Sequence, residues 1–359
     1  MEGLHLNERG VFKLNFTEEF LEEAALEILQ ELGYGHIFAP EISCDGEYPE
    51  RVDYREVILE QRVKEALFRI NKDLPSEALD EAYRQIITFN SPMLEENNKC
   101  FHKLLVEGIE VSFKENGEIR SKRAYIVDFD DKDGNKNNNE FLVVNQFTLV
   151  ENTERRPDLI IFINGIPLVV IELKSASDEN VGIEEAYNQI QTYKRDIPSL
   201  FNYNAFCILS DGINAKAGTI TSNEERFMNW RSIDGQAVEP LSNPQYEVLF
   251  RGILQKSRLL DIIQNFILFQ ESKEEERDSQ GNRIGAKKSI IKILAAYHQY
   301  FAVKKAVEKT KEATSEDGDR KIGVIWHTQG ERVIIVMGAV CVIKSRVSGT
   351  LNKCISCIA

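Results

Sequence analysis

One stretch, residues 156–174 (RPDLIIFINGIPLVVIELK), limits the possible folds of this chain more than any other. Two short and almost wholly apolar runs, Leu159–Ile163 and Leu168–Leu173, flank the dipeptide Asn164-Gly165, which is one of the strongest sequence signals for a β-hairpin. Both runs are rich in β-branched residues. We therefore expect two strands that are buried on both faces of a sheet.

Three charged residues stand at the ends of these two strands. Asp158 precedes the first strand, and Glu172 and Lys174 close the second. Buried strands carry few charges without a partner or a function, and two carboxylates can hold a hard divalent cation such as Mg²⁺. Such a cation polarises a phosphoryl oxygen and lowers the pKa of an attacking water, while Lys174 would orient that water or neutralise phosphate charge. A simple ion pair at the strand ends is the alternative.

The register of the hairpin decides whether these residues meet. A two-residue turn at Asn164-Gly165 would place Asp158 opposite Ile171, whereas a three-residue loop places Asp158 opposite Glu172. A slip of one residue moves every side chain to the other face, so a working site requires the three-residue loop or a bulge. We predict the three-residue loop.

Two helices supply further candidates. Thr17 is expected to cap a helix in which Glu22 flanks the apolar stripe, so Glu22 can reach a buried site, although a solvated surface glutamate is an equal alternative. In a helix predicted over Ile183–Arg195, Gln189 and Tyr193 are four residues apart and share one face. An amide and a phenol so placed can contact a DNA phosphate or support a metal-bound water. That spacing alone means little.

Composition excludes several classes of protein. The chain has 359 residues, enough for two or three domains. Its six cysteines show no disulfide framework, so we expect a reducing cytoplasm, and it shows no signal peptide and no run as long as a membrane span. The net charge of −14 argues against nonspecific DNA binding by the isolated chain. A local basic groove or a partner subunit would have to bring any nucleic-acid substrate.

The stretch 156–174, with the later segments AYNQIQTYKRDIP, LFNYN, SDG and RFMNW, resembles the restriction (R) subunit of type I restriction enzymes. The resemblance implies a nuclease of the PD-(D/E)xK type, with a restriction-endonuclease-like α/β fold in which helices flank a mixed central sheet. The metal-binding aspartate of the family matches Asp158, and its glutamate and lysine match Glu172 and Lys174. The QxxxY element matches Gln189 and Tyr193, and a helical glutamate matches Glu22.

The resemblance also implies a domain order. We expect a nuclease domain with a helical part at 50–106, then a helical charged linker, an incomplete start of a helicase motor, and an aberrant tail, over residues 1–250, 251–290, 291–330 and 331–359. Gln299 matches the glutamine that reads adenine in the family. After Gly330 the expected Ser-Gly-Lys of the phosphate loop is replaced by Glu331 and the residues that follow, so we expect no similarity beyond Gly330 and no ATP binding. A frameshift or interrupted gene would explain this.

The resulting expectation is an R-subunit fragment that hydrolyses DNA phosphodiesters with Mg²⁺. In the family, cleavage follows ATP-driven translocation within an assembly of R, methyltransferase (M) and specificity (S) subunits, and we expect that coupling to be lost here. The alternative is a catalytically idle fragment that docks on the methyltransferase core. A free-standing repair nuclease is less favoured, because a helicase segment begins.

Overall fold

In a computed structural model the chain forms two compact units, residues 1–294 and 295–359. Residues 251–294 thus belong to the same unit as the expected nuclease domain. The structure describes the following residues: 4–6, 12–14, 17–131, 138–175, 181–277, 283–315 and 317–318. No helix among these residues is long and apolar enough to cross a membrane.

A seven-stranded sheet forms the centre of the first unit, in the order β13-β12-β11-β10-β9-β6-β3. The strands are β3 (Gly35–Phe38), β6 (Phe141–Asn145), β9 (Leu159–Ile163), β10 (Ile166–Leu173), β11 (Phe206–Ser210), β12 (Ala215–Gly218) and β13 (Met228–Asn229). The pairs β10–β11 and β3–β6 are parallel, and the other neighbours are antiparallel. Every residue of β9, β10 and β11 is buried, as their continuous apolar runs predict. The expected mixed central sheet is confirmed.

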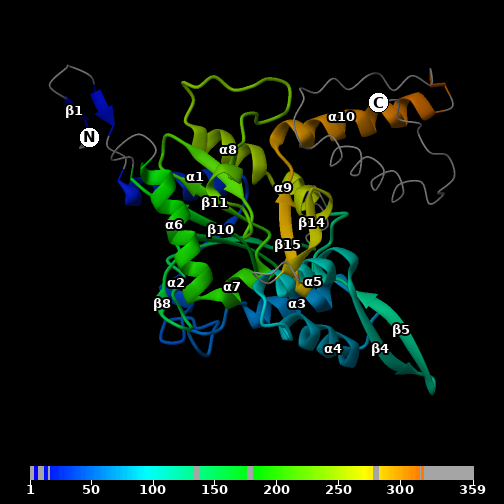
Figure 1. Ribbon diagram of the computed structural model, residues 1–359. Helices are drawn as coiled ribbons and strands as arrows, with labels where there is room; N and C mark the ends of the chain where they lie inside the picture. The colour runs from blue at the N-terminus through cyan, green and yellow to red at the C-terminus, as the bar shows by residue number, and fades with distance from the viewer. Residues whose placement is uncertain are drawn as a thin grey trace. The chain divides into compact units, whose positions relative to one another are not determined.

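Helices flank this sheet (Figure 1). They are α1 (Glu18–Glu31), α2 (Ala39–Ile42), α3 (Glu60–Ile70), α4 (Ser76–Ile87), α5 (Leu94–Glu107), α6 (Val181–Asp196), α7 (Pro198–Tyr203), α8 (Gln245–Ile253) and α9 (Lys256–Asn265). Helices α1, α6 and α7 all contact β10, so three separate elements converge on the strand that ends in Glu172. Thr17 caps α1 as predicted, since its Oγ1 accepts a hydrogen bond of 3.2 Å from the Phe20 amide.

The smaller pairs lie outside the main sheet. They are β1 (Leu4–Leu6) with β2 (Phe12–Leu14), β4 (Ile109–Glu115) with β5 (Glu118–Ala124), and β7 (Leu149–Val150) with β8 (Glu154–Arg155). Helices α3, α4 and α5 lie together beside the β4–β5 hairpin, in the region predicted to be helical (Figure 1).

The turn of the central hairpin differs from our prediction. Ile163 pairs with Ile166 across a two-residue turn, in which Asn164 and Gly165 have φ values of 52° and 78°. Two successive positive φ values define a type I′ turn, the form that suits the twist of an antiparallel hairpin. The predicted three-residue loop is therefore wrong.

A bulge nevertheless produces the register that a working site requires. The pairing shifts between Pro167 and Val169, so that Ile171 pairs with Leu159. One residue further along each strand, Asp158 stands opposite Glu172. The extra residue is Leu168, and its carbonyl accepts a 2.6 Å hydrogen bond from the Ala205 amide, at the entry to β11. The bulge thus has a partner that lies far away in the sequence.

Residues 251–290 are not a helical linker throughout. Helices α8 and α9 are followed by a long hairpin of β14 (Ile267–Arg277) and β15 (Arg283–Leu294). The register pairs Glu274 with Lys287, so the charged stretch is one strand of this hairpin. The sequence analysis expected helices here and missed this strand pairing.

The second unit begins with α10 (Tyr297–Thr314). The side-chain oxygen of Gln299 accepts a 3.0 Å hydrogen bond from the Ala296 amide and so caps the start of its own helix. Residues 319–359 lie outside the described residues, and with them Gly330, the expected phosphate loop around it and the tail 331–359.

Candidate active site

The bulged hairpin brings Asp158, Glu172 and Lys174 together at one end of the strands. An oxygen of the Asp158 carboxylate accepts a 2.7 Å hydrogen bond from the Leu173 amide, which fixes the aspartate against the end of β10. The Lys174 ammonium lies 2.9 Å from Oε1 of Glu172 and donates a 3.0 Å hydrogen bond to the Leu173 carbonyl. The three residues predicted from the hairpin sequence therefore form one cluster.

Burial dominates the electrostatics of this cluster. Glu172 is only 1% exposed, and burial, followed by the nearby charge of Asp158, raises its pKa to about 8. Burial also raises the pKa of Asp158 to about 6, against the opposing effect of the Leu173 hydrogen bond. Burial acts to lower the pKa of Lys174, but Glu172, Asp158 and Glu18 together raise it. The lysine therefore stays protonated at neutral pH, whereas the pKa values of the two carboxyls lie close to neutral pH.

One oxygen of this cluster is left without a partner. Oε2 of Glu172 is buried, and no residue that the structure describes lies within hydrogen-bond geometry of it. A buried acceptor without a partner costs about 1–3 kcal/mol, and such groups in native proteins call for an explanation, an ion among them. Asp158, Glu172 and the Leu173 carbonyl supply oxygen atoms only, which is the ligand type that Mg²⁺ and Ca²⁺ prefer. The donor set fits a hard divalent cation.

The cluster itself contributes the two carboxylates of Asp158 and Glu172. Among the residues that the structure describes, no group of three or more His, Cys, Asp or Glu side chains is placed to hold a metal ion. Zinc sites normally have at least three protein ligands, whereas Mg²⁺ keeps several waters and uses one or two carboxylates.

Glu22 lies beside the cluster and is held in place by two amides. Its two carboxylate oxygens accept hydrogen bonds of 2.7 Å from Asn145 Nδ2 and 2.6 Å from Gln146 Nε2. Its charge contributes to the raised pKa of Asp158. Glu23, the next residue of α1, is exposed, so the helical periodicity separated the two glutamates correctly.

Helix α6 places Tyr193 next to Glu172, with Gln189 beside Tyr193. Tyr193 is buried, and its hydroxyl donates a 3.3 Å hydrogen bond to the Arg156 carbonyl. Burial, and after it the charge of Glu172, raise the pKa of the Tyr193 phenol, while the Gln189 side chain acts in the opposite sense. Tyr193 therefore lies at the cluster, and Gln189 lies beside the Tyr193 hydroxyl, while a role for Gln189 stays a prediction.

Sequence analysis missed four residues at this site. Glu18, in the first turn of α1, lies 3.5 Å from the Lys174 ammonium. Asn145 and Gln146 hold Glu22, and His36 Nε2 lies 2.9 Å from Asn145 Oδ1. The sequence did carry a signal for these two side-chain amides, because a polar Asn-Gln pair ends the apolar run of β6. In the structure Gln146 has a φ of 58°, which is uncommon for a residue other than glycine. The pairing of β6 with β9 then brings the Gln146 amide to the Asp158 carbonyl, 3.1 Å away.

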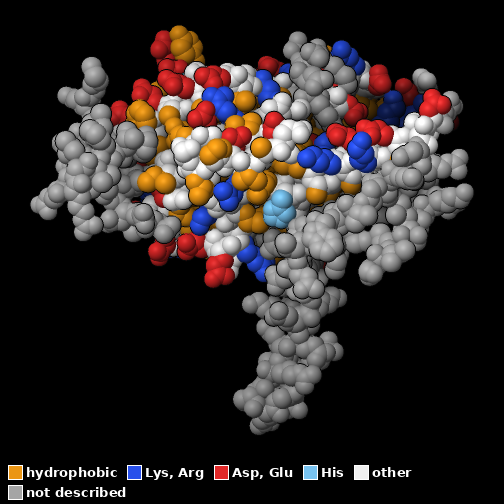
Figure 2. All heavy atoms as spheres, turned by 90° about the horizontal axis from the view of Figure 1, so that it is seen from above, with side chains coloured by type: hydrophobic (Ala, Val, Ile, Leu, Met, Phe, Trp, Pro, Cys, Tyr) orange, Lys and Arg blue, Asp and Glu red, His pale blue; other side chains and the backbone are white. Residues whose placement is uncertain are grey.

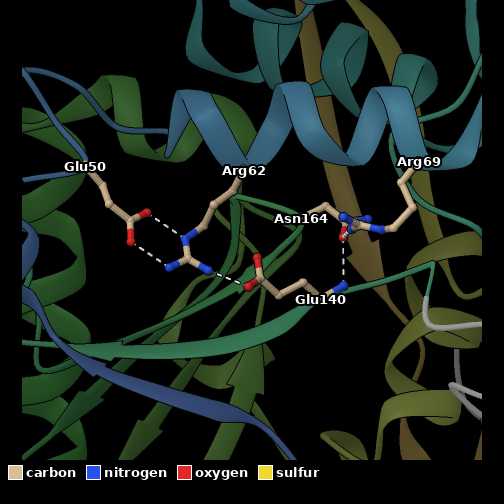
Figure 3. Close-up of polar contacts among 5 residues, drawn as sticks. All are labelled: Glu50, Arg62, Arg69, Glu140 and Asn164. Carbon is tan, nitrogen blue, oxygen red and sulfur yellow. Dashed lines mark hydrogen bonds and ion pairs between the residues drawn. The ribbon is translucent and has the colours of Figure 1, made fainter. Parts of the chain in front are cut away.

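The opposite end of the hairpin is fixed by a polar network (Figure 3). The Asn164 side chain accepts hydrogen bonds from the Glu140 amide (2.7 Å) and from Arg69 (3.0 Å), and donates one to the Ile126 carbonyl (2.7 Å). Arg62 binds Glu50 through two hydrogen bonds of 2.6 Å each, and also pairs with Glu140. These contacts hold the turn against α3 and β6.

Comparison with known proteins adds to this geometry. The family model described as "Type I restriction enzyme R protein N terminus" matches residues 15–226, more than half of the chain and all of the cluster. The chain belongs to this family. A second model, "SWI2/SNF2 ATPase", matches residues 298–345, so the similarity continues past Gly330, where we expected it to end.

Two relatives match most of the chain. This chain is 36% identical over 325 residues to the type I restriction enzyme HindI endonuclease subunit of Haemophilus influenzae. The match covers 89% of this chain and 29% of that subunit. The chain is 33% identical over 348 residues to the putative type I restriction enzyme MjaIXP endonuclease subunit of Methanocaldococcus jannaschii, covering 90% of this chain and 31% of that subunit. The chain thus spans less than a third of the length of these curated relatives.

Proposed function

We propose that the Asp158–Glu172–Lys174 cluster hydrolyses DNA phosphodiester bonds with the help of a divalent cation, Mg²⁺ in the first place. The observation that supports this most is the placement of Asp158 opposite Glu172 by the bulge, with one buried oxygen of Glu172 left without a partner. The membership of the R-subunit family, whose curated relatives are named endonuclease subunits, agrees with it.

Each residue receives a role from its position. Asp158, Glu172 and the Leu173 carbonyl would hold the cation, which when bound would supply charge stabilisation at the phosphoryl oxygen and a more acidic water. Lys174, which remains charged, orients the attacking water or offsets the phosphate charge. Three further residues assist at the edge of the cluster: Glu22 accepts a hydrogen bond from a water, and Gln189 and Tyr193 orient Glu172 or contact the phosphate.

We further propose that this activity belongs to a type I restriction complex in the cytoplasm. Double-stranded DNA, the methyltransferase subunit and the specificity subunit are the proposed partners, and ATP-driven translocation is the proposed coupling of the longer relatives. The net charge is −14, and on the face seen in Figure 2 Lys and Arg side chains are interspersed with acidic and apolar ones. We therefore expect the other subunits to bring the DNA to the cluster.

Calorimetric titration with Mg²⁺, together with nicking of supercoiled plasmid, tests the proposal. The wild-type chain should bind one Mg²⁺ per chain at the cluster, and Asp158→Asn should abolish this binding. Glu23→Gln is the matched control, because it removes one carboxylate from the exposed side of α1 and should leave both readouts unchanged. If the wild-type chain neither binds Mg²⁺ nor nicks plasmid but is captured by the M and S subunits, the docking fragment becomes the better interpretation.

A further inference from the structure

The register of the candidate site depends on the bulge at Leu168, and a single peptide group holds that bulge. The Leu168 carbonyl accepts hydrogen bonds from the Ala205 amide (2.6 Å) and from Asn204 Nδ2 (3.4 Å). Without this bulge, the two-residue turn would place Asp158 opposite Ile171 instead of Glu172. The alignment of Asp158 with Glu172 therefore depends on the orientation of the Asn204–Ala205 peptide group.

The other side of the same peptide group is clamped by two side chains. The Asn204 carbonyl accepts hydrogen bonds from Lys292 Nζ (2.6 Å) and from Asn98 Nδ2 (2.7 Å). The carbonyl of Asn204 and the N–H of Ala205 belong to one planar unit. A clamp on the carbonyl therefore fixes the direction in which the N–H points, which is toward Leu168.

Lysine is an unusual residue for a buried hydrogen-bond donor of this kind. Lys292 is only 1% exposed, and its amine donates a second hydrogen bond, of 2.9 Å, to Asn98 Oδ1. No carboxylate forms an ion pair with it among the described residues. Burying an amine without a counterion is costly, and an apolar residue would fill the same space without that cost. The two hydrogen bonds that the Lys292 amine donates, to the Asn204 carbonyl and to Asn98, account for the presence of a lysine here.

We propose that Lys292 is a positioning residue for the Asp158–Glu172 site, acting through the Asn204–Ala205 peptide and the bulge at Leu168. This inference rests on the proposed nuclease function for its catalytic consequence. Lys292 lies on β15, the last strand before the second unit begins at Ala295. The hairpin β14–β15 thus takes part in building the site. Removing the Lys292 amine would free the Asn204–Ala205 peptide, whose N–H bonds the bulge that sets the register.

Lys292→Met in the full chain is the main test, because methionine fills a similar volume without donating a hydrogen bond. We expect the Mg²⁺ dissociation constant to rise about 10-fold, as for other residues that orient metal ligands, and hydrogen exchange at the Ala205 amide to accelerate. Asn204→Ala, which removes the direct bond to Leu168 but keeps the backbone carbonyl, should weaken Mg²⁺ binding as well. The two effects should not add in the double variant, since both act through one bulge.

Ile290→Ala is the matched control. It removes buried side-chain volume from the same strand and lowers stability, but leaves the amine in place. An unchanged Mg²⁺ affinity in this variant supports the proposal, whereas a loss equal to that of Lys292→Met shows that stability alone is responsible and overturns it. Unchanged exchange at Ala205 in Lys292→Met also overturns it. The exchange measurement does not require catalysis, so a wild-type chain without Mg²⁺ binding would refute the proposed function separately.

Discussion

The Lys174 ammonium lies 2.9 Å from Oε1 of Glu172, a carboxylate that is 1% exposed on a strand end where Oε2 has no partner. The lysine thus occupies one oxygen of the glutamate and leaves the other available. A cation on Oε2 is compatible with a protonated lysine on Oε1, so under the proposed function the cation and the lysine should have separable roles.

Substitutions of Asp158 and Lys174 should separate metal binding from chemistry. Asp158→Asn removes the charged oxygen that the Leu173 amide orients, and should lower Mg²⁺ affinity at least about 100-fold. Lys174→Met should retain Mg²⁺ binding but reduce plasmid nicking by about 100-fold or more, because the charge that acts on water or phosphate is lost. Calorimetry and nicking assays at several Mg²⁺ concentrations measure both. Loss of Mg²⁺ binding in Lys174→Met would contradict separate roles.

Mg²⁺ affinity should depend on pH. The pKa of Asp158 is raised to about 6 and that of Glu172 to about 8, so both carboxyls hold protons that a cation must displace. Affinity should therefore rise steeply between about pH 6 and 8 and level off above. Titrations in buffers of different ionisation enthalpy would also detect proton release on binding. A flat affinity across this range would show that the carboxyls are already ionised.

The buried amine of Lys292 should make the unfolding free energy depend on pH above pH 7. Burial lowers its pKa to about 7 from 10.5, so between these values the unfolded chain binds more protons than the folded chain. Unfolding free energy should thus increase with pH from about 7 to 10.5, relative to Lys292→Met, by at most about 1.4 kcal/mol per pH unit. Urea unfolding of both proteins across this range measures the difference. A constant difference would mean that the pKa is not lowered.

The central turn should tolerate no side chain at Gly165. Its φ is +78°, and an added Cβ would lie 2.6 Å from the Leu59 carbonyl oxygen. We expect Gly165→Ala to lower the unfolding free energy by about 3 kcal/mol, through backbone strain and steric overlap together. Gly117→Ala is a matched control, because Gly117 has a φ of +84° and nothing within 4 Å of the added Cβ. It should cost only the backbone term, about 1 kcal/mol, as urea unfolding would show.

Local patterns were enough to find most of the candidate site. The apolar runs around Asn164-Gly165 predicted the hairpin, and charges in a buried context predicted Asp158, Glu172 and Lys174. Helical periodicity distinguished Glu22 from Glu23. These inferences succeed because strand and helix periods are properties of neighbouring residues. The same approach missed Gln146, because its contact with Asp158 depends on the pairing of β6 with β9.

The central hairpin shows which features follow from the sequence and which follow from the tertiary structure. The sequence alone determined that residues 159–173 form two buried strands joined at Asn164-Gly165, because turn preference and β-branched side chains act locally. Only the tertiary structure decided which residues face each other. The register depends on the bulge at Leu168, whose partner, the Ala205 amide, comes from another strand. That partner lies outside the hairpin, so under our proposal the packing of β11 against β10 sets the alignment of Asp158 with Glu172.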